Sequence, residues 1–236
     1  MPRRPFAVLL AGVLALTGLA ACRDQPIVAA YVGSVQFTNA DVERMVDEFD
    51  NESKGDHRAD VAALVRQAAV TDFVVSEVAT RIANERGLPP RPADPNAYQD
   101  EIDKYGLDAS GAFIKLQERA DAAMATIGPA GQPQAPTEAD QREVYTQLSS
   151  SGVLRRGVTF DQVRPQLDTP DLRTALGLRK VLADGVAKYG VTVNPRYRPL
   201  GIPFPFTLNN GQVPSKLVIP LDPDTHPAVI DATVGP

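Results

Sequence analysis

Residues 29–49 read AAYVGSVQFTNADVERMVDEF, and this stretch sets the pattern of the fold. Its apolar beginning is interrupted by Gly33-Ser34, a turn signal, so we expect a short strand pair or a bent strand over residues 28–38. Thr38 is followed three residues later by Asp41, which is the pattern of a capped helix start. The apolar residues that follow recur at helical spacing and are Val42, Met45, Val46 and Phe49.

Helical spacing of apolar residues continues along most of the chain. We expect a long helix over about residues 57–86, closed by Gly87 and by the prolines of LPPRP, because proline removes an amide donor and clashes with the preceding turn. Its predicted apolar stripe is Val61, Leu64, Val65, Ala68, Val75, Val78 and Ile82. Further helices are expected over about 94–105 and 108–127, from Thr137 to about 148, and from Thr159 to Tyr189 with an interruption at Pro165 and a restart at Thr169-Pro170. The sequence therefore predicts a mostly α-helical domain.

Two stretches break this helical pattern. Residues 128–136, GPAGQPQAP, have neither periodicity nor bulky side chains and are predicted to be a loop or hinge. Residues 191–197, VTVNPRY, read as a strand. An isolated short strand cannot satisfy its backbone groups, so this one must pair with another.

The composition changes after residue 198, where prolines become frequent and helical periodicity ends. Ile202, Phe204, Phe206 and Leu208 alternate, Asn209-Asn210-Gly211 is a hairpin-turn signal, and Leu217, Val218 and Ile219 form a candidate return strand. Three arrangements are compatible with this pattern: a disordered extension, a hairpin packed on the helical domain, or an extended segment that occupies a binding groove. We expect a partly ordered tail that becomes disordered from about Pro220.

The N-terminus has the layout of a secretory signal peptide. Arg3 and Arg4 precede an uncharged apolar run from Pro5 to Leu19. The run is too short to span a bilayer comfortably, since a transmembrane helix needs about 20 apolar residues. We therefore expect an export signal that takes no part in the fold.

The signal ends in Leu19-Ala20-Ala21-Cys22, which resembles the lipobox of bacterial lipoproteins. The resemblance implies cleavage between Ala21 and Cys22, lipidation of the Cys22 sulfur and acylation of the new N-terminus. Acyl chains such as palmitate would then hold the protein at the extracytoplasmic face of the cell membrane, since each buried methylene contributes about 0.8 kcal/mol. Cys22 is the only cysteine, so an intramolecular disulfide is impossible. The alternative is an ordinary signal peptide that is cut elsewhere.

The net negative charge of the chain argues against two kinds of binding partner. Loss of Arg3 and Arg4 with the signal changes the formal charge from −5 to −7. An acidic chain without a basic run argues against nucleic acid as a partner. The same charge argues against electrostatic adhesion to an anionic membrane, so the lipid is the expected anchor.

The opening stretch at 29–49 and the closing stretches TFDQVRPQL and VTVNPRY together resemble the SurA N-terminal-domain family of chaperones, which includes PrsA-type foldases. The resemblance covers residues 28–198. It implies a SurA-like, trigger-factor-like helical lobe in which the VTVNPRY strand pairs with the strand before the first helix. We accordingly expect a signal peptide (1–21), a lipidated linker (22–27), a helical domain (28–198) and a proline-rich tail (199–236).

Family members with isomerase activity carry an inserted parvulin-type domain between the fifth helix and the closing helix. Here only residues 148–159 lie between those helices, whereas a small independent domain needs about 50 residues. The resemblance therefore implies client binding without catalysis, and a peptidyl-prolyl isomerase is the weakest alternative.

No set of residues has the spacing of a catalytic, metal or cofactor site, so we predict a protein that is not an enzyme and needs no cofactor. His57 and His226 lie in distant contexts without a second ligand at metal spacing. The carboxylate pairs Asp100 with Asp103 and Glu138 with Asp140 are predicted to be solvated.

For a chaperone the relevant chemistry is exposed, adaptable apolar surface. Candidates beside the main stripes are Phe73, Val74, Tyr98, Phe113, Ile114 and Met124, which alternatively complete a broad core face. No client-binding residue is assigned. The sequence favours a lipid-anchored, non-catalytic chaperone for unfolded or extended exported polypeptides, and the alternative is an adaptor for one cell-envelope partner. The oligomeric state is left open.

Overall fold

A computed structural model describes residues 27–52, 58–94, 96–105, 107–197, 201–208 and 213–220. The chain is mostly α-helical and includes a small antiparallel sheet, so the predicted fold class is confirmed at this level. The helices are α1 (Asn39–Glu52), α2 (Arg58–Glu85), α3 (Gln99–Tyr105), α4 (Ala112–Ile127), α5 (Glu138–Ser150), α6 (Phe160–Val163) and α7 (Pro170–Tyr189), with 3-10 turns η1 (Gly128–Ala130), η2 (Arg164–Gln166) and η3 (Pro195–Tyr197). The strands are β1 (Val28–Val32), β2 (Val35–Thr38), β3 (Val191–Val193), β4 (Gly201–Leu208) and β5 (Val213–Pro220).

The first sheet joins the two ends of the helical domain. Its strand order is β2-β1-β3, both pairings are antiparallel, and Val32 lies opposite both Val35 and Val191. Gly33 makes the β1–β2 turn with a positive φ of 61°, a conformation that glycine adopts without steric cost. The predicted strand pair and the predicted pairing of β3 with the N-terminal strand are both confirmed.

The closing strand is shorter than the predicted strand over residues 191–197. β3 ends at Val193, and Pro195, which cannot donate to a ladder, begins η3. This turn buries the Tyr197 side chain, whose hydroxyl donates to Asn39 Oδ1 at 2.9 Å. The closing segment therefore bonds to the start of α1 as well as to β1.

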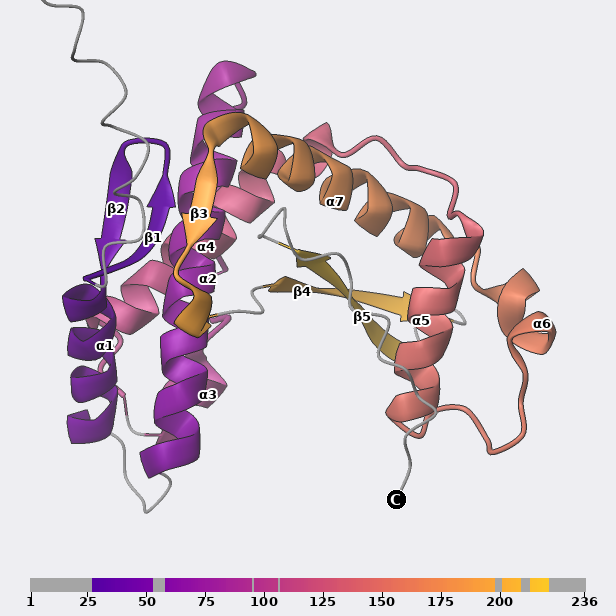
Figure 1. Ribbon diagram of the computed structural model, residues 1–236, viewed down its shortest axis with the longest axis horizontal. Helices are drawn as coiled ribbons and strands as arrows, with labels where there is room; N and C mark the ends of the chain where they lie inside the picture. The colour runs from indigo at the N-terminus through magenta and orange to yellow at the C-terminus, as the bar shows by residue number, and fades with distance from the viewer. Residues whose placement is uncertain are drawn as a thin grey trace, which may run out of the picture.

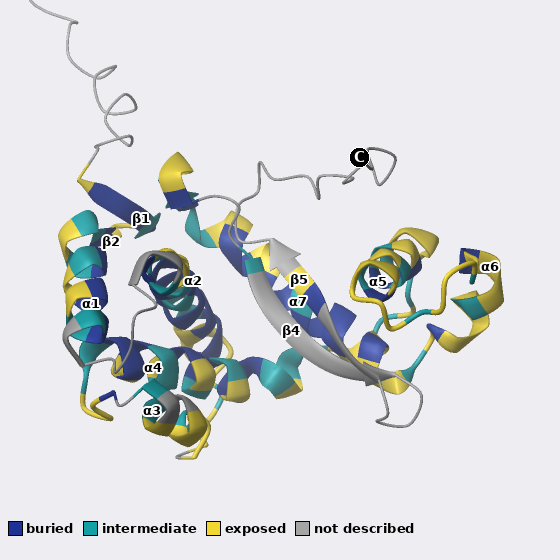
Figure 2. Cartoon of the chain, turned by 90° about the horizontal axis from the view of Figure 1, so that it is seen from below, coloured by how far each residue is buried: buried dark blue, intermediate teal, exposed yellow. Residues whose placement is uncertain are grey.

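The first lobe consists of the sheet and helices α1 to α4, and α2 lies at its centre. The capped start of α1 is confirmed, since Thr38 and Asp41 exchange hydrogen bonds in both directions. Phe37 of β2 stacks on Phe73 of α2 with ring centroids 4.7 Å apart. Figure 2 shows the inward-facing sides of α1, α2 and α4 as buried.

The predicted stripe of α2 is partly wrong. Leu64 is 65% exposed, whereas most other members of the stripe are buried or partly buried. Conversely, Phe73 and Val74 lie off the stripe and are buried, because α2 is covered by α1, α4, α7 and β1 along its middle. A central helix is covered on several sides, so it buries apolar residues outside the single stripe that the spacing predicts.

Helix α7 crosses from the first lobe to a second lobe made of α5, α6, η2 and its own N-terminal half. Its C-terminal half contributes Leu182 and Val186 to the first core, and its N-terminal half contributes Leu172 and Leu176 to the second. Figure 1 shows α7 running above the two lobes like the span of an arch. One continuous helix therefore sets the spacing between two separate apolar cores.

The loop at 131–137 is held against α7. Gly177 has no side chain where the backbone of Gln132 crosses, and a Cβ there would lie 2.7 Å from the Gln132 carbonyl carbon. The Gln134 N–H donates to the Arg173 carbonyl at 2.9 Å. The segment predicted as a loop or hinge begins with η1 and then continues as this loop, which is bonded to the helix it crosses.

The interrupted helix after Thr159 is confirmed as α6, η2 and α7, with Pro165 in η2 and Pro170 in the first turn of α7. Two other helices begin later than predicted. α3 begins at Gln99, and α4 begins at Ala112 because Asp108 accepts hydrogen bonds from Ser110 in a turn that precedes the helix.

Candidate functional site

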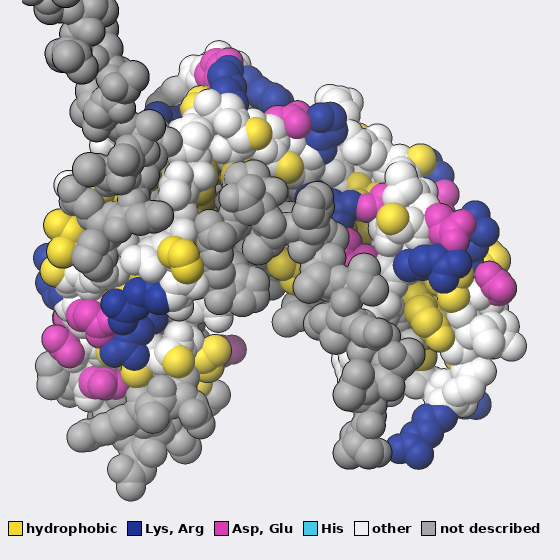
Figure 3. All heavy atoms as spheres, viewed as in Figure 1, with side chains coloured by type: hydrophobic (Ala, Val, Ile, Leu, Met, Phe, Trp, Pro, Cys, Tyr) yellow, Lys and Arg dark blue, Asp and Glu magenta, His cyan; other side chains and the backbone are white. Residues whose placement is uncertain are grey.

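The candidate site is the underside of the arch, between the two lobes and beneath α7. In the space-filling view the molecule is hollowed between the first lobe and the lobe of α5 and α6 (Figure 3). The ribbon view places the β4–β5 hairpin in this region, below α7 (Figure 1). The hairpin contacts elements of both lobes: β4 contacts α7 and α2, and β5 contacts α5 and α7.

The hairpin is an antiparallel ribbon of two eight-residue strands. Its register is continuous from Gly201 opposite Pro220 to Leu208 opposite Val213. These strands are the ones that residue alternation and the Asn-Asn-Gly turn signal predict. Pro220 is the last residue of β5, and the disorder expected from about this position concerns residues 221–236, which lie outside the described part of the chain.

Leu217 of β5 enters the second core. Its side chain has no solvent exposure, whereas its neighbour Val218 is 40% exposed, as expected for successive residues of a strand. The second core is small and otherwise comes from the second lobe alone: Val144, Leu148, Phe160, Leu167, Leu172, Ala175 and Leu176. Among the residues that the structure describes, Leu217 is the one that the C-terminal hairpin contributes to this core.

We call the apolar space between α5 and α7 that Leu217 fills the groove, and contacts that do not involve the hairpin hold these two helices together. Arg179 of α7 pairs with Asp140 and, at 2.9 Å, with Glu143 of α5. Tyr145 of α5 donates its hydroxyl hydrogen to the Val158 carbonyl at 2.8 Å and packs edge-on against Phe160. α5 is therefore held to α7 and to α6 independently of β5.

Asp140 pairs with Arg179 of α7 and also caps the start of its own helix, α5. Burial alone would raise the pKa of its carboxyl, but hydrogen bonds from Thr137 and the Arg179 guanidinium outweigh burial and hold the pKa below its usual value. The hydrogen bonds with Thr137 form a capping box at the start of α5. The sequence predicts that Asp140 is a solvated carboxylate, and this prediction is wrong because the side chain is partly buried and paired with Arg179. Asp100, Asp103 and Glu138 are exposed as predicted.

The apolar candidates from the sequence do not line the groove as exposed surface. Phe73, Val74, Phe113 and Ile114 are buried in the first core, and the partly buried Tyr98 and Met124 pack against it. The alternative in which they complete a core face is confirmed. The sequence named Leu217 only as part of a return strand, because alternation indicates a strand without indicating which side becomes covered.

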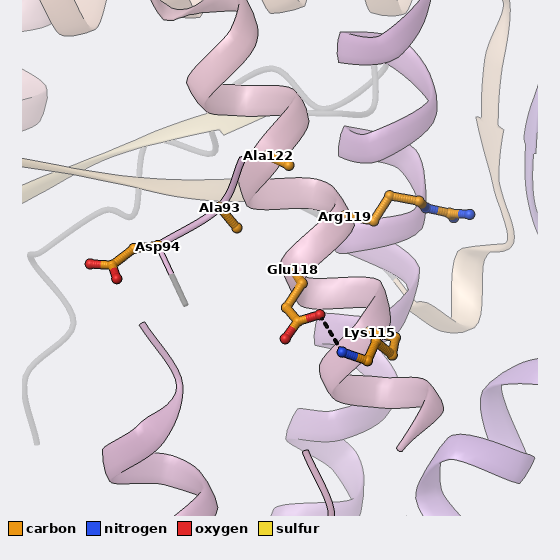
Figure 4. A pocket seen from close by; sticks show the side chains of 6 residues that line it. All are labelled: Ala93, Asp94, Lys115, Glu118, Arg119 and Ala122. Carbon is orange, nitrogen blue, oxygen red and sulfur yellow. Dashed lines mark hydrogen bonds and ion pairs between the residues drawn. The ribbon is translucent and has the colours of Figure 1, made fainter. Parts of the chain in front are cut away.

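A second concavity, an open depression of about 440 Å³ beside α4, lacks the features of a ligand site. Lys115 and Glu118 on its wall bond to each other at 2.8 Å. Arg119 and Asp94 point away from these two side chains (Figure 4). Its polar groups therefore do not converge on a common point, as they do in most small-molecule sites.

Other predicted residues give no further site. His57, His226, Ala21 and Cys22 lie outside the described residues. Within the described part of the chain, no three histidine, cysteine or carboxylate groups are placed to hold a metal ion. Among the helices that the structure describes, none is both long enough and apolar enough to cross a membrane.

Comparisons with known proteins add no relatives. The chain matches no family model. No curated protein is significantly similar to it, and no solved structure is either. The arrangement in hand is therefore an arch of two helical lobes joined by α7, with a groove between α5 and α7 that receives a strand of the chain's own C-terminal hairpin.

Proposed function

We propose that this protein is a lipid-anchored, extracytoplasmic chaperone of the SurA-like class that holds unfolded or extended segments of exported polypeptides without catalysis. The observation that carries the proposal is the groove beneath α7, which already holds an extended strand with an apolar side chain in a small core. A surface that accepts a strand of its own chain has the shape and apolar character required to accept a strand of another.

Two further features support binding without chemistry. Residues 151–159 are all that lies between α5 and α6, which leaves no room for an inserted isomerase domain. The core that Leu217 enters is formed by apolar residues of α5, α6 and α7 together with Leu167, and the charged groups Arg179, Asp140 and Glu143 of α5 and α7 are engaged in ion pairs. Anchoring through Cys22 would keep such a groove close to newly exported chains.

An adaptor for one envelope partner is the second candidate. It is favoured by the fit of one fully buried leucine into the second core, since a single deep position selects for sequence more strongly than a broad apolar surface does. Binding breadth distinguishes the two candidates.

The test is suppression of aggregation. Two unrelated proteins are denatured chemically and diluted into buffer with increasing amounts of the mature chain that carries Cys22→Ser. The proposal predicts that light scattering falls for both clients near an equimolar ratio. Failure with both clients at large excess would reject a general chaperone and favour the adaptor, for which a pull-down from envelope extract should return one dominant partner.

A further inference from the structure

We infer that the groove between α5 and α7 is the client site itself, that it takes an extended segment with an apolar side chain in the position of Leu217, and that β5 competes with clients for it. This inference rests on the proposed function. It names the surface, the chemistry of the bound segment and the element that regulates access.

The occupant of the groove is recognised through one face of a strand. Leu217 has no exposure and joins the second core, whereas Val218, on the opposite face of β5, is 40% exposed. An extended polypeptide places alternate side chains on opposite faces, so one apolar residue enters the core while its neighbours face away. Many unfolded segments meet this requirement, which suits a protein that must accept different sequences.

The groove keeps its shape when the hairpin leaves. α5 is held to α7 by the ion pairs of Arg179, and the 131–137 loop is held to α7 by the bond from Gln134 to Arg173. Tyr145 bonds to the segment before α6. Because none of these contacts involves β4 or β5, release of the hairpin exposes a preformed apolar site.

The hairpin is suited to leave as a unit. β4 and β5 form a separate two-stranded sheet whose backbone pairs are internal, and it shares no ladder with β1, β2 or β3. Undocking therefore breaks no hydrogen bond of the first sheet. Undocking exposes Leu217, the described side chain of β5 that is fully buried, and a client segment with a similar residue restores this burial.

The experiment compares Leu217→Asp with Val218→Asp in the full mature chain that carries Cys22→Ser. Both variants add one carboxylate to adjacent positions of the same strand, but only the first places it in the core. Fluorescence anisotropy gives the Kd for two probes: a labelled, carboxymethylated protein that stays unfolded, and a labelled peptide of residues 211–222. Far-ultraviolet circular dichroism monitors the helices.

If β5 competes for the site, Leu217→Asp lowers the apparent Kd for both probes by about tenfold or more, because apparent affinity scales with the fraction of molecules whose groove is open. Val218→Asp leaves both Kd values within about twofold of the parent chain. When the Leu217→Asp substitution is placed in the 211–222 peptide instead, the peptide binds to neither of the two protein variants, since a buried carboxylate has no partner in this core.

Three outcomes overturn the inference. Equal Kd values for all variants would show that β5 does not compete. Loss of helical signal and of binding in Leu217→Asp would show that the hairpin is a fixed part of the second lobe. A dimer on size-exclusion chromatography that binds no client would show that the groove receives the hairpin of a second copy. If Leu217→Asp binds the peptide more tightly than the parent chain does, but no chain binds or protects an unfolded protein, the groove is not a client site and the chaperone function fails, while competition between β5 and the peptide stands.

Discussion

The crossing of the 131–137 loop over α7 makes Gly177→Ala a sharp test of the arch. In the middle of a helix this substitution normally stabilises by about 1 kcal/mol, because alanine is the better helix former. At Gly177 the new Cβ would overlap the Gln132 carbonyl oxygen and lie 2.7 Å from the carbonyl carbon. Both atoms belong to the backbone, so no side-chain rotation relieves the overlap and the loop must move.

The magnitude follows from three contributions. Forced backbone displacement costs about 1–3 kcal/mol. Displacement of the loop also breaks the 2.9 Å bond from Gln134 to Arg173, a loss of about 1 kcal/mol. After subtracting the gain in helix propensity, we expect Gly177→Ala to lower the free energy of unfolding by about 1–3 kcal/mol.

Gly185→Ala is the matched control, because it lies in the same helix and is close-packed against side chains, whereas Gly177 is close-packed against backbone. Its Cβ would meet Ile82 Cδ1 at 2.7 Å and Val78 Cγ1 at 2.8 Å. Both atoms belong to side chains and not to the backbone. Ile82 Cδ1 ends a flexible side chain that can rotate away, whereas Val78 is β-branched and fully buried, so its overlap requires a small shift between α2 and α7. We expect Gly185→Ala to lower the free energy of unfolding by less than Gly177→Ala does, because no backbone overlap is created and helix propensity offsets part of the cost.

The assay is urea unfolding of the mature chain, followed by circular dichroism. Gly131→Ala supplies a third variant from the opposite side of the crossing, where a Cβ would lie 2.9 Å from the Leu178 nitrogen, and it should also be destabilised. A Gly177→Ala protein that equals or exceeds Gly185→Ala in stability would refute the packing argument, since it would mean that the loop does not lie on α7.

Three more outcomes are expected. The pKa of Asp140 is lower in the folded chain than its ordinary value of 3.8, so the ionised carboxylate stabilises the fold at pH values above 3.8. This stabilisation is lost as the pH falls through the pKa of the folded chain. Asp140→Asn should therefore show a smaller drop in urea midpoint between about pH 7 and about pH 3 than the parent chain does. Leu182→Ala, at a site without exposure, should cost about 2–5 kcal/mol in unfolding free energy, whereas Leu64→Ala, at 65% exposure, should change it by less than about 0.5 kcal/mol; equal effects would contradict the placement of α2 and α7. Replacement of Cys22 by serine should abolish palmitate labelling in cells and move the protein from the membrane to the soluble fraction, and retained labelling would reject the lipobox prediction.

Local chemistry made much of the fold predictable. The cap residues Thr38, Thr137 and Thr169 start α1, α5 and α7, because each side chain accepts a backbone N–H at a helix terminus. Gly87 and Gly190 stop helices with positive φ. These signals act over three or four residues, so they are readable without knowledge of the tertiary structure.

What the sequence left open depends on which surfaces meet. Spacing placed Leu64 on an apolar stripe, but its exposure depends on the neighbours that this part of α2 acquires. The burial of Leu217 requires a helix pair distant in sequence, and the division of α7 between two cores is invisible in its continuous periodicity. The groove is therefore a property of how the elements assemble, and no local motif marks it.

The position of β1 in its sheet bears on the order in which the protein matures. β1 is the central strand, and its partner Val191 follows Val32 by 159 positions. Until β3 becomes available, one edge of β1 has no partner, and exposed edges invite pairing with other chains. The second lobe, whose helices are local in sequence, can gather first. The first sheet closes only when β3 becomes available, and the second core is completed later still by Leu217 of β5, so a chain that stops before β3 leaves an open edge at its own N-terminus.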